Sequence, residues 1–133
     1  AASDVYKRQE LIDSLGLNES IHYHGWVDTK EELCKNAAVI SMSDFEGMQV
    51  AVVEGFCSGG LGMTLNWRGA LEGYPRKWVF ETPEDMGTAL ASVIDGEIDL
   101  EAESAEAFSL IKELYSADKV GKQIEEMMKA IRA

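Results

Sequence analysis

Short runs of consecutive apolar residues alternate along this chain with segments whose apolar residues recur at helical spacing. Residues 37–43 are a continuous apolar run, which predicts a strand covered by helices on both faces, and residues 61–65 predict the next strand. Residues 49–58 between them predict a helix with Val50, Val53 and Cys57 on its apolar side. Alternation of strands and helices at this spacing is typical of a parallel α/β sheet.

The flanking segments extend the same pattern. Residues 21–24 and 78–80 predict two more short strands, and residues 10–15 predict a helix that ends at Gly16. Thr29 with Glu32 has the capping-box spacing, which predicts a helix over residues 30–36. Thr82 predicts another N-cap, because proline follows at the favoured first helical position.

Two further helices are predicted near the C-terminus, the second beginning after Ser116, and no strand lies between them. We therefore expect both to pack outside the sheet. Their apolar stripes consist of Phe108, Ile111, Leu114 and Tyr115 in the first, and Val120, Ile124, Met127, Met128 and Ile131 in the second.

Composition narrows the class of partner. The chain has 133 residues and a net charge of −12, with 24 acidic against 12 basic residues. Non-specific binding to nucleic acid or anionic membranes needs a basic face, so the charge argues against both. No apolar run has the length of a membrane-spanning helix, and no signal peptide is evident, so we expect a cytoplasmic protein. The two cysteines, Cys34 and Cys57, are expected to be reduced, buried and unreactive.

The first nine residues stand apart from this pattern. Residues 4–9 (DVYKRQ) resemble the translated end of a transposon adaptor used in sequencing libraries. The hypothesis is that residues 1–9 are foreign and that residues 10–133 are a partial domain. A genuine helical N-terminus is the alternative.

The stretch 41–54 is the strongest candidate for chemistry. It predicts a strand, a tight turn at Gly47 and then a helix, and ligands in open α/β sheets bind beyond the carboxyl ends of strands. The helix N-terminus there suits phosphate. Glu46 and Glu54 flank it, about 12 Å apart if the chain between them is helical. From spacing alone, the simpler interpretation is that Glu46 is a charge at a helix N-terminus and that Glu54 is a solvated helix residue.

A resemblance changes that interpretation. Glu46 and Glu54 form a Glu-x7-Glu motif between a strand and a helix that ends in Gly59-Gly60. Upstream lie the segments 15–17 (LGL) and 21–27 (IHYHGWV) in the expected order. Together these motifs resemble the C-terminal half of retaining GT-B glycosyltransferases of family 4, over roughly residues 11–131. The resemblance implies a truncated Rossmann-like parallel sheet with C-terminal helices.

The resemblance also implies roles. Glu46 matches the catalytic-site glutamate that contacts donor-sugar hydroxyls, and Glu54 matches the one that binds ribose. The other expected donor-binding residues are Gly47, Met48 and Gln49, whose amides approach the diphosphate, and Val27 and Asp28, which border the nucleobase. The family transfers a sugar from a nucleotide-activated donor with retention of configuration, and needs neither a metal nor a cofactor besides this donor.

The chain also departs from the family pattern. Met48-Gln49 stands where Phe-Gly or a proline is common, and Gly55 where alanine is usual. Nothing before Leu11 matches the family's first two strands, its diphosphate-binding Arg and Lys, or its acceptor domain. We therefore expect the chain to be less stable than its length suggests and prone to aggregation.

Other interpretations remain open. A non-catalytic interaction module on the same scaffold is the main alternative, and a flavodoxin-like or response-regulator domain is less favoured. His22 and His24 alternate on one predicted strand, but no third ligand has suitable spacing, so we predict no metal site. Trp67 and Arg68 are candidates for shaping the donor pocket.

Overall fold

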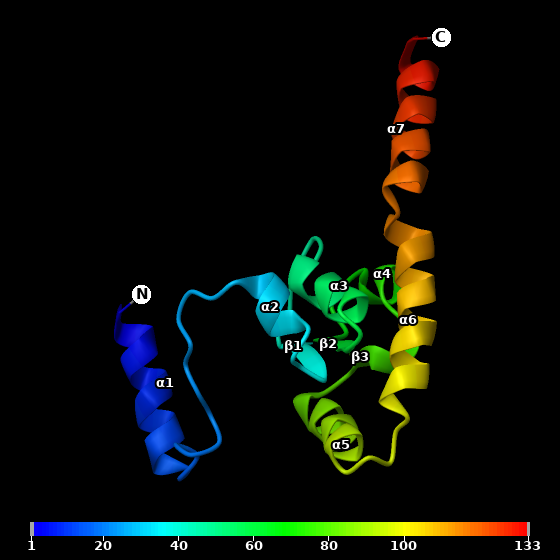
Figure 1. Cartoon of the computed structure of the whole chain (residues 1–133). Coiled ribbons are helices and arrows are strands. Elements are labelled where there is room, and N and C mark those ends of the chain that lie inside the picture. Colours follow the sequence, from blue (N-terminus) through cyan, green and yellow to red (C-terminus); the bar gives the residue numbers. More distant parts are fainter. Residues whose placement is uncertain (1, 133) are drawn as a thin grey trace.

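Three parallel strands form the centre of the structure, a computed structural model that describes residues 2–132. The strands are β1 (Ala38–Ser41), β2 (Leu61–Leu65) and β3 (Val79–Phe80), and they lie in the order β1-β2-β3 (Figure 1). Ala38 pairs with Leu61, and Thr64 pairs with Val79. The predicted α/β class with a parallel sheet is confirmed.

Helix α3 (Val50–Cys57) makes the crossover from β1 to β2 that a parallel pair requires. Two glycines let it lie close to the sheet. A Cβ on Gly55 would be 2.8 Å from the Val39 Cβ, and one on Gly62 would be 2.5 Å from the Val52 carbonyl oxygen. The helix predicted over residues 49–58 is confirmed, since α3 covers all but the two end residues of that range.

The predicted apolar side of α3 is wrong. The helix buries Val52, Gly55 and Phe56, whereas Val50 and Cys57 are exposed, and of the three predicted residues only Val53 packs against the core. Gly55 contacts Val39 of β1, and it carries no side chain that a hydrophobic pattern would register.

Strand β2 is the most deeply buried element, since residues 61–64 are all buried. Gly62 and Thr64 face α3, and the strand's alternation turns Leu61 and Met63 to the opposite face. Helices α5 (Pro83–Ile94) and α6 (Leu100–Tyr115) both pack against this strand. The hydroxyl of Thr82 accepts a hydrogen bond from the N–H of Asp85 at 3.1 Å, so the predicted cap of α5 is confirmed.

Strand β1 differs from β2 because it lies at the edge of the sheet. Ile40 is 41% exposed and Met42, just after the strand, is 54% exposed. The prediction that helices cover both faces of this segment is therefore wrong. No described strand pairs with the outer edge of β1.

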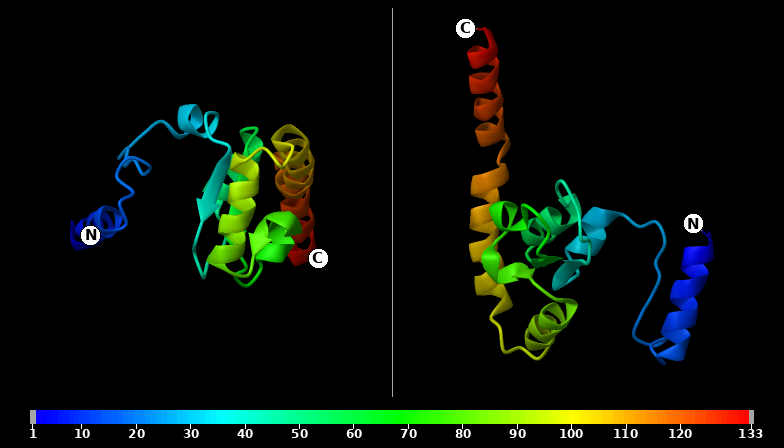
Figure 2. Two further views of the ribbon diagram at one scale, coloured as in Figure 1. Left: turned by 90° about the horizontal axis from the view of Figure 1, so that it is seen from below. Right: turned by 180° about the vertical axis from the view of Figure 1, so that it is seen from behind.

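The N-terminal segment lies apart from the sheet (Figures 1 and 2). Helix α1 (Ala2–Ser14) ends two residues before Gly16, whose positive φ of +67° and hydrogen bond from its N–H to the Asp13 carbonyl oxygen confirm the predicted stop. The strand predicted over residues 21–24 is wrong, because that segment is irregular and pairs with no described strand. Trp26 that follows is fully exposed. Ala1 lies outside the described residues, α1 runs unbroken through residue 9, and the hypothesis about residues 1–9 stays a prediction.

The remaining elements complete the C-terminal half. Between β2 and β3 lie the single helical turn α4 (Ala70–Gly73) and the 3₁₀ turn η1 (Arg76–Trp78), so the strand predicted over residues 78–80 begins only at Val79. Helix α7 (Ala117–Arg132) contacts α6 and extends beyond it, away from the sheet (Figures 1 and 2). None of the described helices combines the length and apolar character needed to cross a lipid bilayer.

Candidate functional site

The carboxyl ends of β1 and β2 open onto one cleft of about 290 Å³. The loop after β1 contributes Glu46 and Gly47, and the loop after β2 contributes Arg68 and Gly69. The ends of parallel strands are where ligands of α/β proteins bind. The other residues that line the cleft are Trp67, Glu72, Gly73, Tyr74 and Tyr115.

A buried polar network anchors the loop that carries Glu46. The side chain of Gln49, which is 7% exposed, donates through Nε2 to the Ser41 hydroxyl at 2.8 Å. Its Oε1 accepts from the Thr64 hydroxyl at 2.7 Å, and Trp67 Nε1 donates to that hydroxyl oxygen at 3.3 Å. The loop is therefore tied to β1, to β2 and to the following loop. Because buried amides and hydroxyls are costly when unpaired, this network favours a single loop conformation.

Tyr74 takes the place of an N-cap side chain for α3. Its hydroxyl accepts a hydrogen bond from the backbone N–H of Gln49 at 2.8 Å, whereas Gln49 itself makes no side-chain cap bond. Burial raises the pKa of the Tyr74 phenol, and the nearby charge of Glu46 acts in the same direction. The site therefore holds a neutral phenol close to the Glu46 carboxylate.

This contact also changes which amides are free to meet an anion. The resemblance assigned the N–H groups of Gly47, Met48 and Gln49 to the diphosphate. That of Gln49 is already bonded to Tyr74. Among the residues that the structure describes, no protein group accepts a hydrogen bond from the N–H of Gly47 or Met48.

Tyr115 closes the far side of the cleft from α6. Its hydroxyl donates to the Gly73 carbonyl oxygen at 3.1 Å, and burial raises its pKa. A Cβ on Gly73 would lie 2.5 Å from that hydroxyl oxygen, so only glycine fits there without rearrangement. The C-terminal end of α6 thereby fixes the loop that follows β2.

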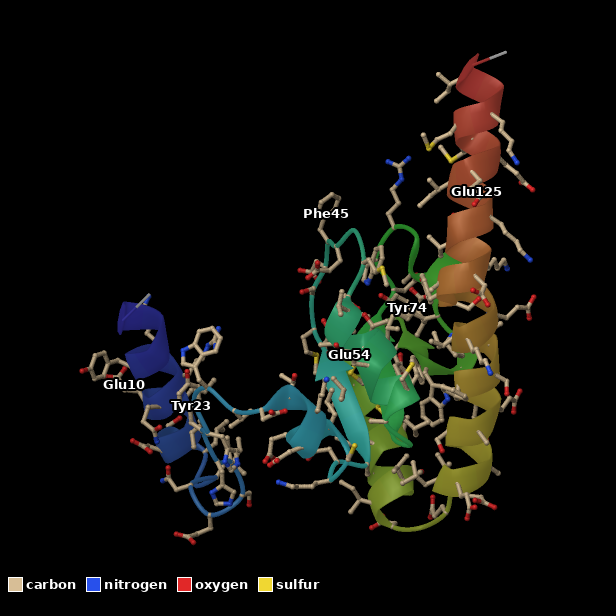
Figure 3. The ribbon with its side chains drawn as sticks, turned by 45° about the horizontal axis from the view of Figure 1, so that its top comes forward. Glu10, Tyr23, Phe45, Glu54, Tyr74 and Glu125 are labelled. Carbon is tan, nitrogen blue, oxygen red and sulfur yellow. The ribbon has the colours of Figure 1, made fainter. Side chains whose placement is uncertain are left out.

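Glu54 lies in a different hollow. It projects from the exposed side of α3 (Figure 3) and lines a groove of about 210 Å³ between α2 (Thr29–Leu33) and α3. The two glutamates of the motif therefore do not share one cavity. Helix α3 begins only at Val50, so the chain from Glu46 to Gln49 is not helical, and the separation of about 12 Å expected for a continuous helix does not apply.

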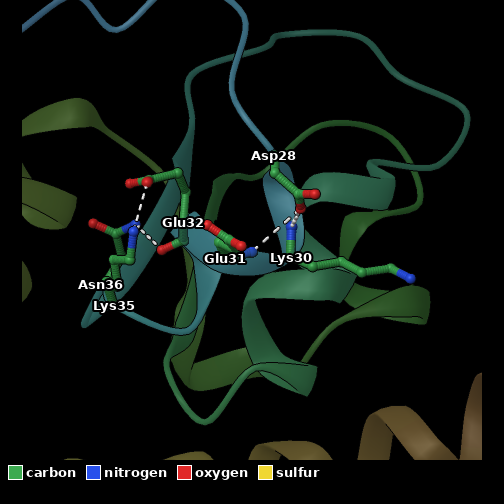
Figure 4. Close-up of polar contacts among 6 residues, drawn as sticks. All are labelled: Asp28, Lys30, Glu31, Glu32, Lys35 and Asn36. Atoms are coloured by element: carbon green, nitrogen blue, oxygen red, sulfur yellow. Dashed lines mark hydrogen bonds and ion pairs between the residues drawn. The ribbon is translucent and has the colours of Figure 1, made fainter.

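Asp28 caps α2, next to this groove. Its carboxylate accepts hydrogen bonds from the N–H groups of Lys30 at 2.9 Å and Glu31 at 3.4 Å (Figure 4). The predicted cap at Thr29 is thus wrong by one residue. Glu32 makes no capping box and instead pairs with Lys35 at 2.8 Å, which lowers the pKa of its carboxyl.

Val27 precedes this cap and is exposed. It does not line the groove that holds Glu54, whereas Thr29 and Lys30 do. Of this segment, the structure thus places Thr29 and Lys30 in the groove with Glu54, while Glu46 and Gly47 line the other hollow together.

The prediction that both cysteines are buried is wrong. Cys34 and Cys57 are exposed, and both line the groove beside Glu54. Partial burial raises the pKa of the Cys57 thiol, and the charge of Glu54 adds to that shift. Within residues 2–132, no three His, Cys, Asp or Glu side chains gather as metal ligands.

Sequence reasoning missed the residues that support the Glu46 loop. Ser41 and Thr64 sit inside apolar strands, where a hydroxyl requires a partner, and that requirement was the available signal. Tyr115 carried no such signal, because it fits the apolar stripe of α6.

Comparison of the chain with protein-family models, with curated proteins and with solved structures found no match.

Proposed function

We propose that this chain is the donor-binding part of a retaining GT-B glycosyltransferase and that it binds a nucleotide-diphosphate sugar across the N-terminus of α3. One observation carries the proposal. Glu46 and Gly47 share a cleft with Arg68 at the carboxyl edge of a parallel sheet. A carboxylate for sugar hydroxyls therefore stands beside a backbone turn and a guanidinium suited to phosphate.

The order of the strands supports the proposed truncated Rossmann-like fold. In a sheet with the order 3-2-1-4-5-6, the last three strands lie side by side in chain order. The order β1-β2-β3 agrees with those three strands. The open edge of β1 then corresponds to the position where the first strand of a complete sheet would pair.

In this proposal the donor extends from one hollow to the other. The sugar lies in the cleft, where Glu46 accepts hydrogen bonds from its hydroxyls. The diphosphate lies over the free N–H groups of Gly47 and Met48, with Arg68 on the side of the second loop. These groups stabilise the negative charge that grows on the leaving diphosphate as the bond to the sugar breaks.

The nucleoside lies toward the groove between α2 and α3. Glu54 accepts hydrogen bonds from the two ribose hydroxyls, as acidic residues do in dinucleotide-binding folds. Val27 and Asp28 border the base. Asp28 borders the base without a hydrogen bond from its carboxylate, since that carboxylate already caps α2.

Calorimetric titration of the chain with uridine, guanosine and adenosine diphosphates and their sugar conjugates tests the proposal. Saturable binding of one nucleotide is expected. Glu54→Gln should weaken the binding of that nucleotide by about 10- to 100-fold, as expected when a hydrogen bond to a charged group is lost. Glu46→Gln should weaken only the added affinity of the sugar conjugate.

Glu125→Gln on α7 is the matched control, because it removes the same charge far from both hollows (Figure 3). It should leave every affinity unchanged. Absence of saturable binding for all the nucleotides would contradict the proposal.

An interaction module is the second candidate, and the surface of α7 favours it. None of the described residues of this helix is buried. It exposes a stripe of large apolar side chains, which are Val120, Ile124, Met127, Met128 and Ile131. Large exposed apolar patches mark interaction surfaces. A module of this kind would show no nucleotide binding in the same titration.

A further inference from the structure

The only two cysteines of the chain lie in the same groove. Cys34 is the C-cap residue of α2, and Cys57 is the last residue of α3. Both are exposed and neither is in a disulfide. Two thiols from separate elements thus face one hollow, with Glu54 on its wall.

Helices α2 and α3 differ in how many of their residues are buried in the core. Helix α3 is anchored by the buried side chains of Val52 and Phe56, so Cys57 has a fixed position. Helix α2 has only five residues and buries none of them. A disulfide requires the two Cα atoms to lie about 4.4–6.8 Å apart. Because α2 has no buried residue, no fully buried side chain holds it against an approach of Cys34 to Cys57.

We propose that Cys34 and Cys57 form a reversible disulfide with a hydroperoxide as oxidant, and that the disulfide closes the groove beside Glu54. The closure matters for nucleotide binding only if the proposed function holds. Disulfide formation itself does not depend on that function.

The reaction balances as two thiols and one hydroperoxide giving a disulfide, an alcohol and water. The Cys34 thiolate attacks a peroxide oxygen, the O–O bond breaks, and the alcohol leaves with a proton, so that Cys34 becomes a sulfenic acid. The Cys57 sulfur then attacks the Cys34 sulfur, and the S–O bond breaks. The departing hydroxide takes the Cys57 proton and leaves as water. Two electrons pass from the thiols to the peroxide.

The order of attack follows from the surroundings of each thiol. Burial and the charge of Glu54 disfavour the thiolate of Cys57, so Cys57 is the resolving partner. Cys34 lies at the exposed end of α2, where a peroxide reaches it.

Mass spectrometry of the intact chain after treatment with a stoichiometric hydroperoxide is the first test. We expect a monomer that has lost two hydrogens and no longer reacts with iodoacetamide. Trypsin without reduction should then release residues 31–35 joined to residues 36–68, since lysine or arginine ends each of these peptides. A dithiol reductant should restore both free thiols.

Cys34→Ser and Cys57→Ser are the matched controls. Each should lose the intramolecular product, and Cys57→Ser should accumulate sulfenic acid at Cys34 that a dimedone probe captures. The proposal is overturned if the oxidised chain keeps two alkylatable thiols, or if its cysteines bond only between two copies of the chain.

Nucleotide titration of the oxidised and reduced chains is the second test. Oxidation should abolish the binding of the nucleoside diphosphate, and reduction should restore it. If the disulfide forms and binding is unchanged, the closure of the groove is refuted. If neither form binds any nucleotide, the proposed function fails while the disulfide pair stands.

Discussion

Residues 61–65 and residues 21–24 both have short apolar or alternating patterns typical of strands, yet only the first segment forms one. Strand β2 pairs on both sides and is almost wholly buried. Residues 21–24 have no described neighbour and stay exposed. Every described residue that is buried lies between Gln49 and Ile111. The difference teaches that a strand pattern yields a strand only where partner strands and covering helices are present.

Phe56 and Phe45 offer the largest test of this contrast, since they are the same residue type in opposite surroundings. Phe56 is 1% exposed between α3 and the sheet, whereas Phe45 is 83% exposed at the tip of its loop (Figure 3). Phe56→Ala should cost about 3–5 kcal/mol of unfolding free energy, the range for a buried phenylalanine. Phe45→Ala should change it by less than about 0.5 kcal/mol. Urea unfolding followed by circular dichroism measures both, and equal effects would refute the assignment of the core.

Tyr74 tests the polar part of the core. Tyr74→Phe leaves the buried N–H of Gln49 without its acceptor, which should cost about 1–3 kcal/mol at neutral pH. Tyr23→Phe, at an exposed hydroxyl, is the control and should cost nothing measurable.

The pH dependence of stability follows from the same residue. Folding raises the pKa of Tyr74, so its contribution is full below the unfolded value of about 10 and is lost as pH rises through the folded pKa. Stability should therefore fall in alkaline solution, and less steeply in Tyr74→Phe. Urea midpoints between neutral pH and about pH 11 test this sign; a steeper fall in the variant would contradict it.

Asp28 tests how independent α2 is from the core. Asp28→Ala removes the helix cap, which is typically worth about 1 kcal/mol to the helix. Because α2 buries no residue, the loss should stay local. Amide exchange at Lys30 and Glu31 should quicken while the global unfolding midpoint is unchanged. A lower midpoint would show that α2 is part of the cooperative core.

Deletion of residues 1–27 should have the smallest effect. None of the described residues in this segment is buried, so removal should change the unfolding free energy by less than about 0.5 kcal/mol. Calorimetric melting of the shortened chain is the measurement. Loss of the cooperative transition would show that the N-terminal segment supports the sheet.

Local signals in the sequence predicted the central fold well. The strands predicted at residues 37–43 and 61–65, the crossover helix, the stop at Gly16 and the cap at Thr82 each depend on a few neighbouring residues. The buried side of α3 depends on the contact of Gly55 with Val39, which is distant in sequence. That contact, like the missing pairing of residues 21–24, has no local signature.

In the candidate site too, the sequence predicted what depends on neighbouring residues and missed what depends on distant contacts. The motif located Glu46 and Glu54, but whether they share a hollow depends on where α3 begins and on the position of α2. The hydrogen bond that removes the Gln49 amide from the set of free donors comes from Tyr74, 25 residues away. The exposure of the cysteines likewise follows from how α2 and α3 meet.

An amide-resolved NMR titration of the chain with nucleoside diphosphates tests the central claim most directly. The proposal predicts saturable shifts at the amides of Gly47 and Met48, whose N–H groups are free to bind phosphate, and a much smaller shift at Gln49, whose N–H is held by Tyr74. Glu54→Gln should move the saturation point to higher nucleotide concentration. Unchanged spectra with every nucleotide, or shifts confined to residues away from the N-terminus of α3, would contradict the account.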